Sequence, residues 1–549
     1  MNHALVLPAQ RSRPLLRRIV KSTTTWLACF VVFQVTLTQP IVAQSTAEDR
    51  AALFDYILAQ TLARESFSPI KNRNLGLDVE RAMLRLRDEV IAADTEEKLY
   101  YALAKLSNAR KDRHLSIGLV QGGITLRDTT GVPQANYPVP GTPVLHAPIK
   151  FATDYGSPGG YFVFVADYAQ DIGRHSGGSV PQVGDKLVAI NGLAFADYVA
   201  AIEPYHRYSS VNGLWWQLAT WIPQRSYQFP RSLYRENLEL QLERQSGEQY
   251  QLVLPYMAQD EISWLGQGAQ HYPGFTLVFS TPTFDLYRSQ RPQAVLLSWH
   301  RFESSLPDDI DRLMDYAVEH ELLDHAVIVD ATRSGGGSLG AYAVRRLSPK
   351  PFKTTFGNLR ISDAAAQFLQ ERRQRAAERG FSSPRPGEID DGRWLLEWLE
   401  SDVAAAIEAG QLYSTAVPFK NAHAPGYSDG ILRPAEVHFR GPMVCWLGPY
   451  GGSHLDQFAS IVIDNGLAYT MGMPAGGYSN TWEHEEVLTF PISGEPVATF
   501  MWSIGHTIRP NGEILEGNPA RVDEFIPVTR ENYGNYYEIL LRRSLEHVR

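Results

Sequence analysis

The sequence predicts a multi-domain α/β protein, and its length and three apolar segments carry that prediction. With 549 residues the chain is too long for a single hydrophobic core, so several domains are expected. Apolar runs at 294–299, 326–329 and 443–447, broken only by Ser298, are typical of strands buried on both faces of a parallel sheet. Helical sequence follows the last two runs and precedes the second, which favours alternating strands and helices.

The first 44 residues have the features of a secretory signal peptide. They contain five basic residues and no acidic one, then an apolar run at 26–35 and a candidate cleavage point near Ala43 or Gln44. An uncleaved membrane anchor is the alternative, although the run is short for a membrane span. We therefore expect an exported protein, periplasmic or secreted, with no stable membrane insertion once segment 1–44 is removed.

The remaining chain is acidic and holds one cysteine. Segment 1–44 contains five of the 51 basic residues and none of the 60 acidic ones, which leaves a formal charge of about −14. Such a charge gives no general attraction to nucleic acid, so no nucleic-acid partner is expected. Because Cys29 lies in the signal segment, Cys445 has no partner for an intrachain disulfide. Its apolar neighbours favour a buried, inert thiol over a catalytic one.

Residues 45–120 are predicted to form an N-terminal helical region. Apolar residues recur there at helical spacing in three sets, within 53–62, 79–90 and 99–106. Asp94 and Glu97 are spaced as a capping box for the third helix. The segment 111–119 after it is expected to be a turn followed by a short strand.

A small mixed β domain is predicted at 161–255, after a linker or surface loop at 121–160 that is rich in Gly and Pro. A strand at 183–190 ends in an Asn-Gly pair, which is typical of a tight turn. A helix is expected at 195–202.

The predicted α/β core has two parts, 256–362 and 411–549. A charged helical insertion at 363–410 separates them. Its charge run at 370–375 is most simply interpreted as a solvated helix face.

Ser453 is the first candidate functional residue. It follows the apolar run 443–447 and a glycine-containing turn, and a helical segment begins directly after it. At such a place the free backbone N–H groups and the helix dipole favour a developing oxyanion. An ordinary N-cap serine needs the same location, so both interpretations stay open on local sequence.

The segment 330–338 is the second candidate. Three glycines, 335–337, leave its backbone free to approach another group closely and to point N–H groups at an anion. A phosphate-binding loop is disfavoured because no Lys followed by Ser or Thr comes after the last glycine. A flexible turn is the remaining alternative.

His114 and Glu516 are unremarkable alone, since a lone His is usually structural and a lone Glu usually a surface acid. The order of the motifs, however, resembles the tail-specific (C-terminal processing) serine proteases and their relatives, the tricorn core and the chlamydial secreted protease. Those proteins have a "D.H" turn, a PDZ-like module containing "GD.L..ING", a strand ending in "D.R.NGGG", a serine that opens a helix and a "G..IEG" tail. This sequence has the counterparts in the same order, at 112–114, 184–192, 330–338, 453 and 512–517.

The resemblance implies a fold and a set of roles. The fold is an N-terminal helical domain, a PDZ-like β domain at 161–255 and a protease core with a crotonase-like ββα superhelix. Ser453 would be the nucleophile, His114 the general base and Glu516 the residue that orients or charge-balances the base. Backbone N–H groups of Gly336 or Gly337, and of His454, would form the oxyanion hole. The expected partner is a protein or peptide substrate.

The sequence also departs from the family pattern. Tyr478 stands where the Ser/Lys branch has its lysine, so the Ser/His/Glu branch is favoured. Thr332 and Ser334 replace the usual Arg and Asn of the glycine loop. These changes leave room for an inactive relative that binds peptides or apolar ligands on the same scaffold. An enzyme acting on a small ester or amide is a third option.

No metal and no nucleotide cofactor are expected, because no His, Cys or Asp cluster has ligand spacing along the sequence. The oligomeric state is left open, a homodimer included.

Overall fold

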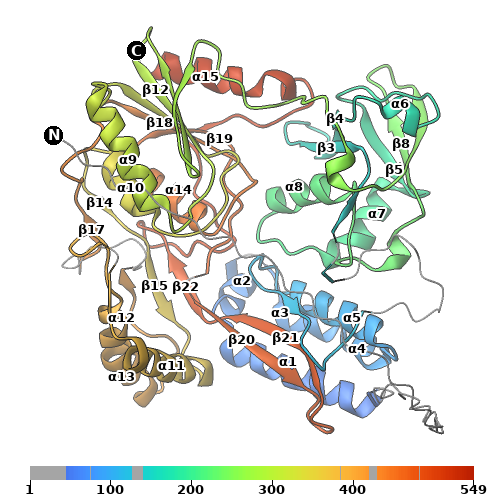
Figure 1. Ribbon diagram of the computed structural model, residues 1–549. Coiled ribbons are helices and arrows are strands. Elements are labelled where there is room, and N and C mark those ends of the chain that lie inside the picture. Colours follow the sequence, from blue (N-terminus) through green and yellow to red (C-terminus); the bar gives the residue numbers. More distant parts are fainter. Residues whose placement is uncertain are drawn as a thin grey trace, which may run out of the picture. The chain divides into compact units, whose positions relative to one another are not determined.

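The computed structural model describes residues 45–74, 76–126, 140–141, 143–383, 385–418, 429–480 and 482–548 (Figure 1). The predicted signal peptide and its cleavage point lie outside these residues, so both stay predictions. In the described part of the chain, no helix is long and apolar enough to cross a membrane.

A seven-stranded sheet carries the three predicted buried runs side by side. Its strand order is β10-β11-β12-β13-β18-β19-β23, antiparallel from β10 to β12 and parallel from β12 onward. The strands are β10 (Thr276–Ser280), β11 (Phe284–Ser289), β12 (Ala294–Trp299), β13 (Ala326–Asp330), β18 (Met443–Leu447), β19 (Tyr469–Gly472) and β23 (Glu524–Phe525). Every residue of β12, β13 and β18 is buried, which confirms the sequence prediction for these strands.

Helices cover both faces of this sheet, which explains why the strands are almost entirely apolar. Alternate residues of β12, β13 and β18 pack on one face against α9 (Leu306–Glu319), α10 (Gly340–Leu347) and α14 (His454–Asp464). The other face packs against α15 (Tyr536–His547), seen beside the sheet in Figure 1. Cys445 is fully buried within the first of these cores, as predicted.

The N-terminal helices share a second core with strands from near the other end of the chain. These helices are α1 (Ala47–Arg64), α2 (Ser68–Asn74), α3 (Val79–Leu84), α4 (Arg87–Ala92) and α5 (Glu96–Asn108). Several of them pack with the antiparallel sheet of β1 (Ile117–Gly118), β21 (Pro496–Ser503) and β20 (Glu483–Thr489). The predicted cap of α5 is wrong by one residue: Thr95 Oγ accepts from Lys98 N at 3.2 Å, whereas Asp94 forms an ion pair with Lys98.

The charged insertion packs on this same second core. It forms α11 (Asp363–Arg379), α12 (Arg393–Trp398), a π-helical turn (Leu399–Val403) and α13 (Ala404–Glu408). Phe368 and Trp398 are buried there, and both contact Trp482. The run at 370–375 is almost entirely exposed, as expected for a solvated helix face.

A six-stranded antiparallel sheet with two helices forms a third core. Its elements are β3 (Ile149–Asp154), β4 (Phe162–Tyr168), β5 (Lys186–Ile190), β6 (Leu193–Ala194), β8 (Leu238–Glu243), β9 (Gln249–Leu254), α7 (Phe195–Ile202) and α8 (Val211–Trp221). Asn191 and Gly192 both have positive φ, 51° and 83°, as the predicted tight turn requires.

One predicted boundary does not hold. Residues 145–154, assigned by sequence to the linker or loop 121–160, form β2 (Leu145–His146) and β3. β3 is buried at four of its six positions and pairs with β4 over its whole length. The Gly- and Pro-rich composition around it concealed this strand.

The remaining short elements connect these cores. They are α6 (Ile172–His175), β7 (Gln224–Arg225), β14 (Phe352–Lys353), β15 (Phe356–Leu359), β16 (Val417–Pro418), β17 (Ile431–Leu432), β22 (Gly505–Ile508) and the 3₁₀ turns Glu203–Tyr205, Arg231–Leu233, Gln259–Glu261 and Tyr533–Asn535.

Candidate active site

Ser453 lies at the carboxyl end of β18, in the turn that leads into α14. Its backbone has φ 58° and ψ −121°, a conformation that costs a non-glycine residue about 1–3 kcal/mol. Its N–H donates to the Tyr478 carbonyl at 2.5 Å, which helps to hold this conformation. The Ser453 hydroxyl caps no N–H of α14. The Ser453 backbone is therefore strained, although the hydroxyl does not cap the helix. An N-cap role, the main structural explanation for a serine at this position, does not account for Ser453.

The glycine loop lies directly against this serine. A Cβ on Gly336 would come within 2.7 Å of Ser453 Cβ and 3.2 Å of Ser453 Oγ. Gly337 has φ 145°, and a Cβ there would lie 1.7 Å from the Phe302 carbonyl oxygen. Only glycine fits both positions, so the backbone of the loop is the surface presented to the hydroxyl.

His454 contributes to the site through its backbone only. It is the first residue of α14, where N–H groups have no partner within the helix. Its imidazole points elsewhere: Nε2 accepts from Gly340 N at 2.6 Å, and the ring packs against Phe302. Burial lowers the pKa of His454 to about 4, which keeps the ring neutral and able to accept.

His114 and Glu516 are far apart in the sequence but lie close together in the structure. One side-chain atom each of Asp112, His114 and Glu516 lies within 4.8 Å of the others. Asp112 Oδ1 accepts from His114 N at 2.9 Å, and Glu516 Oε2 accepts from Ser479 N at 2.8 Å. Asp112 Oδ2, His114 Nδ1 and Glu516 Oε1 are buried without a hydrogen-bond partner among the described residues. The structure thus brings the predicted base and the predicted acid together and adds Asp112.

Lys71 completes this group, and sequence reasoning missed it. Its ammonium donates to the carbonyls of Arg110 and Lys111 at 3.0 and 2.9 Å. The same Nζ atom lies 3.6 Å from Glu516 Oε1 and 3.8 Å from Asp112 Oδ2, with a side chain only 2% exposed. No motif surrounds Lys71 in the sequence, so no local signal identifies it.

The three potential ligand atoms do not fit a metal ion well. The Lys71 ammonium already supplies a positive charge to both carboxylates, and it would repel a divalent cation placed between them. We interpret the cluster as a buried hydrogen-bonding and ion-pair group.

Burial sets the protonation states in this group. Removal from water lowers the pKa of His114 to about 4; Asp112 opposes that shift, and Arg113, Arg207 and Lys71 add to it. Burial and the neighbouring Asp112 raise the pKa of Glu516, while Lys71 acts in the opposite direction. At neutral pH the imidazole is therefore uncharged, as a general base must be.

Tyr478 contacts both halves of the site. Its ring centroid lies 5.0 Å from that of His114, and the Arg113 guanidinium lies 4.5 Å over the same ring. A Cβ on Gly452 would lie 1.9 Å from Tyr478 Cε1, so the ring packs on the backbone next to Ser453. Within the described residues no hydrogen bond joins Ser453 Oγ to His114. The structure pairs Ser453 with Gly336 and His114 with Glu516, and Tyr478 contacts each pair.

The loop that carries Tyr478 is held from two sides. Asp456, in the first turn of α14, accepts from Gly477 N at 3.1 Å and from Tyr478 N at 3.0 Å. Burial raises the pKa of Asp456 to about 7. Ser210, the N-cap of α8, donates to the Gly476 carbonyl at 2.7 Å. The six-stranded sheet with its helices α7 and α8, called the six-stranded module below, therefore contacts the loop that carries Tyr478.

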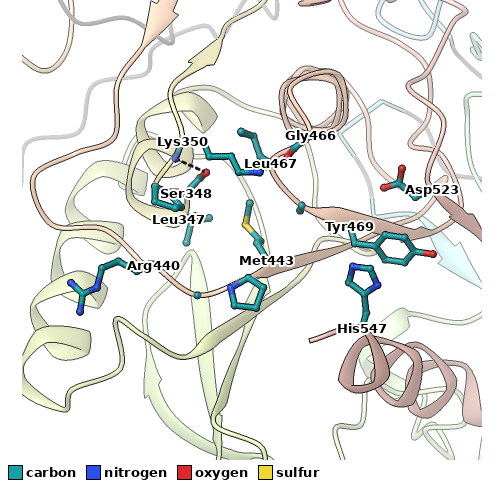
Figure 2. A pocket seen from close by; sticks show the side chains of 14 residues that line it. Leu347, Ser348, Lys350, Arg440, Met443, Gly466, Leu467, Tyr469, Asp523 and His547 are labelled. Atoms are coloured by element: carbon teal, nitrogen blue, oxygen red, sulfur yellow. Dashed lines mark hydrogen bonds between the residues drawn. The ribbon is translucent and has the colours of Figure 1, made fainter. Parts of the chain in front are cut away.

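A pocket of about 450 Å³ lies at the amino ends of β18 and β19 in the seven-stranded sheet, at the other end of these strands from Ser453 (Figure 2). Met443 and Tyr469, which line it, are the first residues of β18 and β19, whereas Ser453 follows the last residue of β18. Chemistry in α/β sheets is usually found at the carboxyl ends of the strands. No candidate residue from the sequence lies in the Figure 2 pocket, and we do not assign the active site to it.

A family scan finds no matching protein family for this sequence, and no curated protein matches it. Solved structures, in contrast, do match. Among them are structures of mature CPAF, of the photosystem II D1 C-terminal processing protease and of the tricorn protease.

In particular, the fold is that of mature CPAF. The TM-score is 0.66 at 13% identity, over 91% of this chain and 96% of CPAF. Mature CPAF complexed with lactacystin matches with a TM-score of 0.65, 13% identity and coverages of 91% and 99%. The photosystem II D1 C-terminal processing protease has a TM-score of 0.37 at 12% identity, with coverages of 87% and 92%. The mixed α/β, multi-sheet architecture and its likeness to the fold of mature CPAF are thereby established.

Proposed function

We propose that the chain is an exported serine endopeptidase that hydrolyses peptide bonds with Ser453 as nucleophile and His114 as general base. One observation carries the proposal: Ser453 has a strained backbone, caps nothing and lies against Gly336. A strained serine in a sharp strand-to-helix turn is how an exposed nucleophile is presented in other hydrolases. We infer that the six-stranded module acts as a PDZ-like domain and that the core has the crotonase-like ββα superhelix.

In this mechanism the neutral His114 imidazole takes the proton of Ser453 Oγ as that oxygen attacks the peptide carbonyl. The resulting imidazolium later gives the proton to the leaving amine. Asp112 favours the charged imidazole through its Coulombic attraction, and Glu516, with its raised pKa, lies within the same buried group. We assign the oxyanion hole to the backbone N–H groups of Gly336 or Gly337 and of His454; the close approach of Gly336 to Ser453 and the place of His454 at the start of α14 support this assignment.

The base and nucleophile must come within about 2.6–3.2 Å for proton transfer. Catalytic hydrogen bonds often tighten only when substrate binds. We infer that the Tyr478 ring moves when a peptide enters, which lets Ser453 Oγ reach His114.

An inactive peptide- or apolar-ligand-binding protein is the second candidate. The contact of Tyr478 with both Gly452 and His114 favours it, because the ring lies where it can keep the pair apart. Labelling with a fluorophosphonate probe separates the two functions. We expect the wild-type protein to label and Ser453→Ala and His114→Ala to fail, while Ser246→Ala, in an exposed hairpin, labels normally.

Lactacystin, with which mature CPAF forms a complex, provides a competitor for the same label. A folded wild-type protein that neither labels nor cleaves a peptide library would favour the binding-protein candidate. Labelling without peptide cleavage would favour a small ester or amide as substrate. Export is tested separately, by cell fractionation and N-terminal sequencing of the mature chain.

A further inference from the structure

A cavity of about 450 Å³ lies beside the two loops that flank Ser453. One wall is 447–450, which ends three residues before Ser453. Another includes Thr332 and Arg333, and Arg333 precedes Gly336 by three residues. Three residues of extended chain span about 10 Å, so a peptide whose scissile bond lies at Ser453 can reach this cavity.

The other walls come from two further parts of the fold. Trp216 and Thr220 belong to α8 of the six-stranded module, and Tyr533, Tyr536 and Tyr537 lie at the start of α15. Seven of the twenty lining residues are aromatic, and Trp216 packs edge-on against Tyr450, with ring centroids 4.9 Å apart. Such a cavity fits apolar or aromatic side chains of a peptide.

The charged residues of the lining are all basic. They are Lys150 and Arg333, and no acidic residue belongs to the wall. Lys150 is already neutralised, because its Nζ atom lies 3.3 Å from Asp167 Oδ2 and over the Trp264 ring.

Arg333 forms no ion pair within the described residues, and Asp330 attracts it only over a longer distance. Its Nη2 donates to the Gly268 carbonyl at 2.7 Å, and its guanidinium lies 5.4 Å from the Tyr537 ring centroid. No carboxylate of the described residues lies within ion-pair distance of it, and the residue is exposed. A guanidinium has five N–H donors, so most of those on Arg333 remain available to a ligand.

We propose that this cavity is a substrate subsite in which Arg333 binds a carboxylate of the peptide, beside an apolar or aromatic side chain packed against Tyr450 and Tyr537. The planar guanidinium suits a carboxylate because two parallel N–H···O bonds can form. The carboxylate comes from an Asp or Glu side chain or from a chain end. This proposal rests on the proposed function, since it assigns the substrate preference of the same site.

Peptide cleavage tests the preference. Fluorogenic peptides with amidated ends, identical except for Glu, Gln or Lys at one scanned position, are compared with a Gln peptide that has a free carboxyl end. We expect the best Glu peptide, or the free-end peptide, to exceed the amidated Gln peptide by about tenfold in kcat/KM, as one charge-assisted interaction provides. Whichever peptide has the higher kcat/KM, the Glu peptide or the free-end peptide, identifies the source of the carboxylate.

Substitution of Arg333 gives the matched test. Arg333→Gln is expected to lose the preference, so that the Glu, Gln and free-end peptides are cleaved with similar kcat/KM, and Arg333→Glu is expected to favour the Lys peptide. Arg333→Lys retains the charge without the planar fork and is expected to keep part of the preference. Arg440→Gln, whose exposed partner Asp324 lies elsewhere, is expected to behave as wild type.

Binding separates this proposal from the proposed function. Fluorescence anisotropy of the same peptides on Ser453→Ala, with and without Arg333→Gln, reports the subsite without any catalysis. A carboxylate preference in binding that disappears with Arg333→Gln supports the subsite even if the wild-type protein proves inactive. Equal binding of all peptides by Ser453→Ala, or a preference unchanged by Arg333→Gln, would overturn it.

Discussion

The two halves of the candidate site depend on different physical features. Ser453 and its glycine loop lie at the carboxyl ends of parallel strands, where tight turns and missing Cβ atoms shape the backbone. His114 and Glu516 lie instead among buried charged side chains, where Asp112 and Lys71 determine the electrostatics. The first half is specified by local conformation and steric fit, and the second by long-range packing of charges. Substitutions in the two halves should therefore have different effects on activity and stability.

The largest expected effect is at Ser453, where activity and stability should change in opposite directions. Ser453→Gly removes the nucleophile and relieves the positive-φ strain, so peptidase activity should fall about ten-thousandfold. Stability should rise by about 1 kcal/mol relative to Ser453→Ala, which keeps the strain. Steady-state kinetics and thermal unfolding check both changes. A Gly variant that is less stable than the Ala variant would contradict the strained-turn interpretation.

Gly336→Ala should have the next largest effect, because its new Cβ would press on Ser453. We expect kcat to fall by about 10²–10³ with the fold retained, as for loss of an oxyanion donor. Gly335→Ala is the matched control, since a Cβ there meets nothing within 4 Å. Equal activity of the two variants would show that the loop does not act on Ser453.

Substitution of Lys71 should damage stability more than that of any exposed lysine. Lys71→Met removes the buried cation that lies against both Asp112 and Glu516, which should cost about 3–5 kcal/mol of unfolding free energy. Lys98→Met, which removes an exposed ion pair with Asp94, should leave the unfolding midpoint almost unchanged. Urea unfolding of both variants measures the difference. Similar midpoints would show that Lys71 has no special electrostatic role.

The pH dependence of activity should report the burial of His114. Its pKa is lowered to about 4, so the neutral base is lost only as the pH falls through about 4. We expect kcat/KM at pH 5 to remain near its neutral value, although an ordinary histidine with a pKa near 6.5 would be mostly protonated there. Profiles with a short peptide substrate test this. An acid limb near 6.5 would mean that water reaches the imidazole in the working enzyme.

The smallest effect is expected from metal removal. Because the Lys71 ammonium already lies within 3.6–3.8 Å of the Glu516 and Asp112 carboxylates, treatment with EDTA should leave activity and thermal stability unchanged. Loss of activity that zinc or another divalent ion restores would reassign the Asp112, His114 and Glu516 cluster as a metal site.

Sequence reasoning succeeded where the apolar pattern of neighbouring residues was clear. The buried runs at β12 and β18 and the helix α7 were predicted at their exact bounds, because period and apolar content are properties of neighbouring residues. The same reasoning failed for β3, where Gly and Pro on either side indicated a loop while pairing with β4 made a strand. It also chose Asp94 over Thr95 as a cap, because both residues suit the position.

By itself, the sequence determined the buried strands, the glycine-bounded turn around Ser453 and, through the order of its motifs, a resemblance to a protease family. Only the tertiary structure decided which side chains meet: Lys71 and Asp112 with Glu516, Tyr478 with His114, and Arg333 with an aromatic cavity. The physical reason is that conformational preferences act over a few residues. Electrostatic and steric contacts depend instead on distances in space, and the fold makes residues far apart in the chain into neighbours.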